Sequence, residues 1–417
     1  LVRRSSLDDA FRAGARTIAP ASSRLRAVLV VTEVALSFVM LVGAGLLVRT
    51  LANLHRVPLG FDADRVLAMD VTIPESRYSR PVLWRGFYER LLERTQSLPG
   101  VESAAIVTLR PLWGPVGMDW PFTVEGQSER DAERNPLLNL EAVSPDYFRT
   151  MGIPIRRGRA LAATDDDAHP GAVVVSESMA RRYWPGQDPI GKRLKLPMPD
   201  TVFDNAWLTV VGVAGDARYR ELQASRLDLY MSYRQADHRP HHLVVRTRVE
   251  PAAMAGSVRD AVRGIDPDVP VTDVLALAQA VSEALGSPRF AALVFAGFAV
   301  IAVMLAALGL YGLLAYSVSR RTREIGVRVA LGARAAQVRR LVLREGVGLT
   351  AIGLAIGCLA AAGASRLLES LLFGVKATDA ATFVMGAAVL ALVALAACLL
   401  PARRAARVDP AVALRTE

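Results

Sequence analysis

Four long apolar runs interrupt the 417-residue sequence, and each is nearly free of charged side chains. Each run is about 20 residues or longer, roughly the length that a helix needs to cross the hydrocarbon layer of a membrane. A helix buried in a water-soluble protein is usually shorter and carries its apolar residues along one face. We therefore predict transmembrane helices over residues 27–48, 290–318, 346–365 and 380–402.

The polar segments between these runs differ in charge, which predicts the side of the membrane that each occupies. The net charge of +10 is concentrated in three of them. Residues 1–26, 319–345 and 403–417 carry six, eight and four basic side chains, each against two acidic ones, whereas residues 49–289 and 366–379 are nearly balanced. Short segments rich in arginine stay on the cytoplasmic side of a membrane. We therefore expect both termini in the cytoplasm and the two balanced segments outside the inner membrane.

The long segment 49–289 mixes the periodicities of helices and strands. Apolar residues at helical spacing over Arg80–Leu98 end at Pro99-Gly100, and a strand is predicted to follow at Val101–Leu109. A similar helix and strand recur at Ala252–Gly264 and Val269–Val274. Between these units, the sequence predicts strands at Ala172–Val175, Leu208–Val213 and Leu243–Arg248 and a short helix at Ser176–Tyr183. The predicted fold class is a multi-pass α-helical membrane protein with a large extracytoplasmic α+β domain.

One segment of this domain has the spacing of a phosphate-binding loop. Gly186 to Lys192 fits the pattern G-x-x-x-x-G-K, in which backbone amides and the lysine hold phosphate groups and a following Ser or Thr binds Mg²⁺. Arg193 occupies the position of that hydroxyl residue, and Pro189 removes one backbone amide. The sequence therefore predicts a structural turn that binds no nucleotide.

Other candidate chemistry in the domain is incomplete. His238, His241 and His242 have no cysteine or carboxylate pair nearby in the sequence to complete a metal site. The run from Asp165 to Asp167 lacks the spaced ligands of a calcium-binding loop. We expect no enzymatic activity, metal or cofactor. Nucleic acid is not an expected partner either, because the basic residues flank membrane spans.

Two features within the apolar runs are candidates for helix packing or function. Glu33 places a carboxylate inside the first run, where a charge is costly and is by default a functional hypothesis. A polar packing contact and a transport-linked role are both open for this residue. Gly353, Gly357 and Ala361 recur at every fourth position, a spacing of small residues that lets two helices approach closely. Their partner is either a helix of the same chain or one of a second copy.

The segment between the second and third apolar runs is short, basic and helical in pattern. Gly332 predicts a break after a short helix over Thr322–Leu331. Leu331, Val338, Leu341 and Val342 are expected on one face of the segment, opposite Arg340 and Arg344. A basic amphipathic helix of this kind either lies on anionic lipid or fits a groove of a cytoplasmic partner.

Several motifs along the chain point to one family. They are Arg323-Glu324-Ile325-Gly326-Val327-Arg328 with Ala330-Leu331-Gly332-Ala333, the stretch from Pro401 to Pro410, Tyr147-Phe148 before Met151-Gly152, and Trp184-Pro185-Gly186 before Ile190-Gly191-Lys192. Together these motifs resemble the MacB/FtsX-like family of ABC transporter permeases, whose order of four spans with a large domain between the first two agrees with the predicted order. Tandem-duplicated orphan permeases of acidobacterial type are the branch that this chain resembles most.

The resemblance implies a permease that works with a separate ABC ATPase subunit and with a second permease unit, either an identical copy or a tandem partner. In that family the short cytoplasmic helix couples the permease to the ATPase. This coupling is thereby assigned to Arg323, Glu324, Ile325, Gly326, Arg328, Leu331, Gly332 and Ala333. Membrane lipid and a periplasmic adaptor are further expected partners. The expected function is ATP-driven motion of the outer domain for export or efflux; the alternative is a regulatory membrane protein that controls a cell-envelope hydrolase or a signalling pathway.

Overall fold

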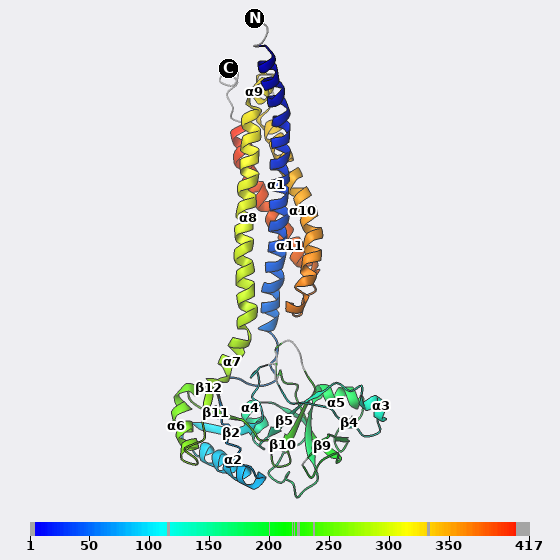
Figure 1. Ribbon diagram of the computed structural model, residues 1–417, viewed down its shortest axis with the longest axis vertical. Helices are drawn as coiled ribbons and strands as arrows, with labels where there is room; N and C mark the ends of the chain where they lie inside the picture. Colours follow the sequence, from blue (N-terminus) through cyan, green and yellow to red (C-terminus); the bar gives the residue numbers. More distant parts are fainter. Residues whose placement is uncertain are drawn as a thin grey trace. The chain divides into compact units, whose positions relative to one another are not determined.

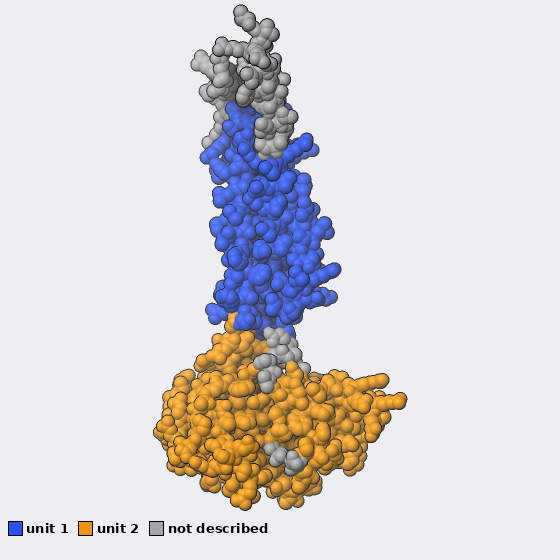
Figure 2. Space-filling view, in the orientation of Figure 1, with its two compact units in different colours: residues 1–55, 287–417 blue, residues 56–286 orange. Residues whose placement is uncertain are grey.

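The computed structural model describes residues 5–114, 117–199, 201–218, 220, 222, 226–236, 238–331 and 334–405, and the side chains of residues 5–23, 323, 329 and 330 are not described. The chain divides into two compact units, which Figure 2 colours separately. The helical unit comprises residues 1–55 and 287–417, and the α+β domain comprises residues 56–286.

Four long helices of the described residues build the helical unit (Figure 1), and each contains a stretch long and apolar enough to cross a membrane. They are α1 (Ser5–Leu54), α8 (Gly286–Arg320), α10 (Ala335–Leu367) and α11 (Ala380–Ala405). A short helix, α9 (Thr322–Ala330), joins α8 to α10, and a 3-10 turn, η1 (Glu369–Leu371), follows α10. The predicted multi-pass helical class is confirmed. The helices run past the apolar residues because their hydrogen bonding continues into the flanking polar sequence.

Two apolar clusters fill the interior of the helical unit. The first joins Val34 of α1 to Leu314 of α8 and Val342 of α10. The second is centred on Phe38 of α1, whose ring meets that of Phe383 edge to face with centroids 5.9 Å apart. Residues of α1, α10 and α11 contribute to both clusters, so these three helices pack together along their lengths.

The first and last parts of the α+β domain form a ferredoxin-like sheet. Its elements are β1 (Val66–Asp70), α2 (Pro81–Gln96), β2 (Val101–Val107), β11 (His242–Thr247), α6 (Pro251–Arg263) and β12 (Thr272–Ala276). The strands pair antiparallel in the order β12-β1-β11-β2, so each β-α-β half has a strand of the other half between its own two. This order is the split β-α-β arrangement. The helix–strand units predicted from the sequence are α2 with β2 and α6 with β12.

The chain between β2 and β11 extends the same sheet. Its elements are β3 (Asp119–Trp120), β4 (Thr123–Val124), α3 (Glu129–Ala132), β5 (Leu138–Val143), α4 (Tyr147–Met151), β6 (Ile155–Gly158), β7 (Ala172–Ser176), α5 (Glu177–Tyr183), β8 (Arg193–Lys195), β9 (Leu208–Ala214) and β10 (Asp228–Ser232). The strand order continues β2-β5-β10-β7-β9-β8-β4, with β3 beside β5 and β6 beside β9. This is the β-rich insertion that the sequence predicts, although only β7 and β9 of its strands were among the predicted ones; β1, outside the insertion, was not predicted either.

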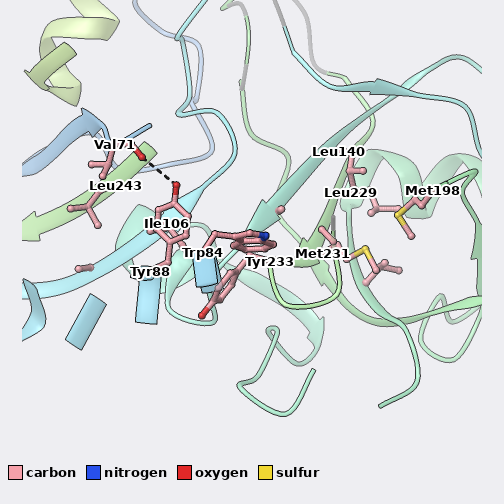
Figure 3. Packing of buried hydrophobic residues seen from close by; sticks show 14 of the residues in the cluster. Val71, Trp84, Tyr88, Ile106, Leu140, Met198, Leu229, Met231, Tyr233 and Leu243 are labelled. Carbon is pink, nitrogen blue, oxygen red and sulfur yellow. Dashed lines mark hydrogen bonds between the residues drawn. The ribbon is translucent and has the colours of Figure 1, made fainter. Parts of the chain in front are cut away.

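Helices cover both faces of this sheet, so its strands alternate between two cores. Leu67 and Met69 of β1 point to the core under α2 and α6, whereas Val66 and Ala68 point to the core under α4 and α7 (Leu277–Ala284). Figure 3 shows the first core, where the rings of Trp84, Tyr88 and Tyr233 gather. The Tyr88 hydroxyl donates a hydrogen bond to the carbonyl of Val71 (3.2 Å), which gives its buried polar end a partner.

Candidate functional site

The helix α9 is held to the helical unit by one face. Ile325 is only 3% exposed and joins the cluster that contains Val34, Leu314 and Val342, and Gly326 beside it is also buried. The inner face of α9 is therefore a packing surface of the bundle.

The opposite face of α9 is exposed, and we call Glu324, Val327, Arg328 and Leu331 the α9 outer face. Glu324 Oε1 and Arg328 Nη2 form an ion pair of 2.6 Å one helical turn apart, with each side chain about half exposed. Val327 is 42% exposed and Leu331 is 83% exposed. Charged and apolar side chains thus lie together on a surface that no other described residue covers.

Polar contacts stabilise the junction between α8 and α9. Glu345 of α10 accepts a hydrogen bond from Ser317 Oγ of α8 (3.3 Å) and pairs with Arg321 (3.4 Å), the residue that joins α8 to α9. Arg404 Nη1 of α11 donates to the hydroxyl of Tyr311 on α8 (2.9 Å). The contacts of Glu345 tie α8 to α10 where α9 begins, and the Arg404–Tyr311 contact ties α11 to α8 more than two turns earlier along α8.

The structure changes one expectation about this segment. Val338 and Val342 are buried, but Leu341 is 38% exposed and Leu331, at 83% exposed, does not share their face. The reason is that α9 ends at Ala330 and α10 begins at Ala335, so the helical phase does not continue between them.

For three of the residues assigned to coupling, the structure does not describe the side chain. Gly332 and Ala333 lie outside the described residues, and so does the side chain of Arg323. Val327 is the exposed residue of α9 that was not assigned a coupling role from the sequence, because an isolated valine gives no signal until its surroundings are known.

The stripe of small residues on α10 faces α1 of the same chain. A Cβ atom added at Gly353 would lie 2.7 Å from Val34 Cγ1, and one added at Gly357 would lie 2.9 Å from the carbonyl oxygen of Ala35. Ala361 is buried beside them. The two helices therefore approach so closely that only glycine fits at the first two positions.

Glu33 lies between α1 and α8, away from the outer face of α9. Its Oε2 atom is buried without a hydrogen-bond partner among the described residues, and a Cβ atom added at Gly309 of α8 would lie 2.1 Å from it. One turn further along α1, Ser37 Oγ donates to the carbonyl of Ala302 on α8 (2.7 Å). The Glu33 carboxylate thus lies with Ser37 on the side of α1 that contacts α8.

The segment with phosphate-loop spacing is a turn before a strand. Gly186 and Gly191 have φ values of +72° and +81°, which a glycine adopts without strain. Asp188 Oδ1 accepts the amide of Ile190 (3.1 Å), and the Lys192 amine donates to Gln187 Oε1 (2.8 Å). The lysine is therefore used within the turn, and β8 follows where a phosphate loop would continue into a helix.

The histidines and the acidic run of the α+β domain do not converge on a metal site. His238 meets Trp120 edge to face, whereas His242 lies in β11 with its Nδ1 atom 3.1 Å from the carbonyl oxygen of Thr108. Burial lowers the pKa of His242 to about 4. Asp165 binds Arg159 at 2.7 Å, and Asp167 binds Arg85 instead. Among the described residues, no group of three or more His, Cys, Asp or Glu side chains could hold a metal ion.

A buried polar cluster in the sheet was not predicted from the sequence. Asn139 Nδ2 donates to Asp228 Oδ1 (3.1 Å), Arg220 Nη2 donates to Asn139 Oδ1 (2.8 Å), and the amide of Leu109 donates to Glu141 Oε2 (3.0 Å). Burial raises the pKa of Asp228 to about 8 and raises that of Glu141 well above its usual range. The cluster joins β5 to β10, and its acidic groups favour their neutral forms.

Two family models match the chain in succession. The MacB-like periplasmic core domain matches residues 28–265, and the FtsX-like permease C-terminal matches residues 296–410. The macrolide export ATP-binding/permease protein MacB of Hahella chejuensis is 28% identical over 312 residues, which cover 71% of this chain and 46% of that protein. The probable export ATP-binding/permease protein MacB of Pseudomonas entomophila is 26% identical over 337 residues, which cover 77% of this chain and 48% of that protein. The chain thus spans about half the length of these curated relatives.

Among solved structures, the periplasmic region of MacB from Actinobacillus actinomycetemcomitans is 15% identical, covers 53% of this chain and 92% of that chain, and has a TM-score of 0.37. Both matched regions of the present chain are permease regions. Because the periplasmic-core model alone matches more than half of the residues and the FtsX-like model follows it, this chain belongs to the MacB/FtsX-like family of ABC transporter permeases.

Proposed function

We propose that this chain is the permease subunit of an ABC-type exporter and that a separate ATPase subunit docks on α9. One observation carries the proposal: α9 buries Ile325 in the helical unit and exposes Glu324, Val327, Arg328 and Leu331. A helix that is held on one face and exposed on the other can accept a partner's groove and pass on its movement. The relatives' names, which include macrolide export, favour export as the direction of transport.

The charge distribution supports an orientation with α9 in the cytoplasm. The segment 319–345 carries eight basic and two acidic side chains, whereas residues 49–289 are close to neutral. Arginine-rich short segments resist translocation. We therefore place both termini and α9 on the cytoplasmic side of the inner membrane, and the α+β domain and the loop 366–379 outside.

The proposed mechanism is mechanical coupling through α8. Ile325 ties α9 to the bundle, and α9 follows directly on α8, which is one helix from Gly286 to Arg320. At its other end α8 is joined through α7 to β12, the edge strand of the ferredoxin-like sheet. Closure of the ATPase on α9 would displace α8 as a rigid element and so move the sheet. A second permease unit supplies the opposing domain against which this movement acts.

The experiment measures ATP hydrolysis by the ATPase subunit that copurifies with the full chain, in lipid nanodiscs. Glu324→Arg breaks the ion pair with Arg328 and leaves two like charges one turn apart on the docking face. We expect the stimulation of hydrolysis by the permease to fall at least about tenfold, as for loss of a buried charged contact worth roughly 2 kcal/mol or more. Glu369→Arg, an equal charge change at the exposed η1 turn, is the matched control and should leave stimulation unchanged.

A second variant tests the apolar part of the α9 outer face. Leu331→Asp places a charge on the most exposed apolar side chain of the α9 outer face and should also abolish stimulation, while membrane insertion is retained. Full stimulation in both Glu324→Arg and Leu331→Asp would show that the ATPase does not dock here. Copurification of a stable hydrolase without any ATPase would instead favour the regulatory function.

A further inference from the structure

A cavity of about 470 Å³ lies within the helical unit, between α1, α8 and α10. It is formed at the end of α8 from which α9 starts, and Figure 1 shows α9 at that end of the unit. Arg24 comes from α1, Tyr316 and Arg320 come from α8, and Glu345 comes from α10. Its volume suits a small polar group.

The polar end of this cavity has an excess of positive charge. Three arginines and one glutamate line it, for a net charge of +2. Glu345 is already engaged, because it pairs with Arg321 at 3.4 Å and accepts a hydrogen bond from Ser317. Within the described part of the chain, Arg24 and Arg320 form no ion pair. Two guanidinium groups are therefore available to an anion.

The other end of the cavity is apolar and lies deeper along the helices. Leu313 is two helical turns from Arg320 on α8, and Leu349 is one turn from Glu345 on α10. Between the two ends stands Tyr316, whose ring lies 4.1 Å from the guanidinium carbon of Arg26. Tyrosine and arginine side chains at the end of a transmembrane helix are typical of the membrane–water interface.

We propose that this cavity binds the headgroup of one anionic phospholipid. Arg24 and Arg320 hold the phosphate, and the first carbons of the acyl chains lie along Leu313 and Leu349. Basic pockets between transmembrane helices are suited to such headgroups. A soluble phosphate would use the arginines and leave the leucines uncovered, so the lipid is the ligand that matches both ends. The site requires no ATPase and is independent of the proposed coupling function.

The test is native mass spectrometry of the full chain, released from detergent after titration with phosphatidylglycerol or with phosphatidylcholine. We expect one phosphatidylglycerol to be retained with clear preference over phosphatidylcholine. The double variant Arg24→Gln/Arg320→Gln should bind it about 30-fold more weakly, the loss expected for two interfacial arginines. Arg24→Lys/Arg320→Lys should retain most of the binding, because the charge is kept.

The matched control is Arg339→Gln/Arg340→Gln, which removes two exposed arginines of α10 that do not line the cavity. It should retain phosphatidylglycerol like the unaltered chain. Equal loss in the control, or equal retention of the two lipids by the unaltered chain, would overturn the proposal. Displacement of the lipid by millimolar glycerol 3-phosphate would also overturn it, because the site would then be a general anion site.

Discussion

The two units of this protein fill their interiors with different kinds of side chain. The α+β domain packs large aromatic rings such as Trp84, Phe87 and Tyr88. The helical unit brings α1 onto α10 through Gly353 and Gly357. Transfer of apolar surface out of water stabilises the first interior. Lipid is as apolar as the side chains themselves, so close contact between helix backbones must stabilise the second.

This difference can be measured because the tryptophans report on one unit alone. All five tryptophans of the chain lie between residues 56 and 286, the bounds of the α+β domain. Tryptophan fluorescence therefore follows unfolding of this domain. Far-UV circular dichroism at the helical minimum is dominated by the four long helices and follows the helical unit.

The largest effect is expected from Phe87→Ala in the α+β domain. Phe87 is fully buried, and its ring meets those of Tyr78 and Tyr88 with centroids 5.4 Å away in each case. Truncating such a side chain costs about 3–5 kcal/mol, so the fluorescence transition should fall by roughly 10 °C or more.

The control for this variant is Val82→Ala on the same helix, whose side chain is exposed. It should change the domain's stability by less than about 0.5 kcal/mol. The circular dichroism transition of the helical unit should be unaffected by either change. A similar loss in both variants would mean that burial in this core does not stabilise the domain.

An intermediate effect is expected from Gly353→Leu in the helical unit. The added side chain meets Val34 within 2.7 Å, and overpacking of this kind costs about 1–3 kcal/mol. Titration with a denaturing detergent should unfold the variant at a lower concentration, as followed by circular dichroism. Gly363→Leu on the same helix has no atom within 4 Å of its Cβ position and should behave like the unaltered chain. Equal sensitivity of both variants would contradict close packing as the source of stability.

A pH dependence of stability is also expected, and Asp228→Asn should reduce it, while Glu141, whose pKa is raised too, keeps its own contribution. Burial raises the pKa of Asp228 from 3.8 to about 8, so the folded domain keeps this carboxyl protonated while the unfolded chain ionises it. The group therefore stabilises the fold at low pH, and this contribution is lost as the pH rises from about 4 to about 8. At pH 8 the variant should unfold at a higher temperature than the unaltered chain, and at pH 4 the two should unfold at the same temperature.

The control here is Asp204→Asn, an exposed aspartate of the same domain, which should leave the pH dependence intact. Fluorescence melting curves between these two pH values make the comparison. If Asp228→Asn and the unaltered chain share one pH profile, the carboxyl of Asp228 is ionised in the folded domain.

Polar residues within strands explain which strands the sequence could predict. β7 and the second half of β2 are apolar runs, and both strands lie where strands were expected. β5 and β10 were missed because Asn139, Glu141 and Asp228 interrupt their apolar pattern. These polar residues are buried only because they hydrogen-bond within one cluster. That cluster includes Arg220, about 80 positions further along the chain, and no local pattern reveals such a partner.

The coupling segment shows a similar limit. Its charge and its break near Gly332 predict a short basic helix, and α9 lies there. Which face of α9 is buried depends on α1, α8 and α10, because Ile325 packs among their residues. Leu331 is exposed because α9 ends before α10 begins, so the two helices do not share one continuous helical pattern. A helical projection drawn over the whole segment assumes such a pattern and therefore misplaces this residue.

The central claim is that α9 and the α+β domain lie on opposite sides of one membrane, and cysteine accessibility tests it most directly. In a chain with Cys358 and Cys398 replaced by alanine, Glu324→Cys and Ala253→Cys each introduce one exposed thiol. A membrane-impermeant maleimide applied to intact spheroplasts should label the Ala253→Cys protein at once. It should label the Glu324→Cys protein only after the membrane is permeabilised. Labelling of both proteins in intact spheroplasts would place α9 outside with the domain and would contradict the account.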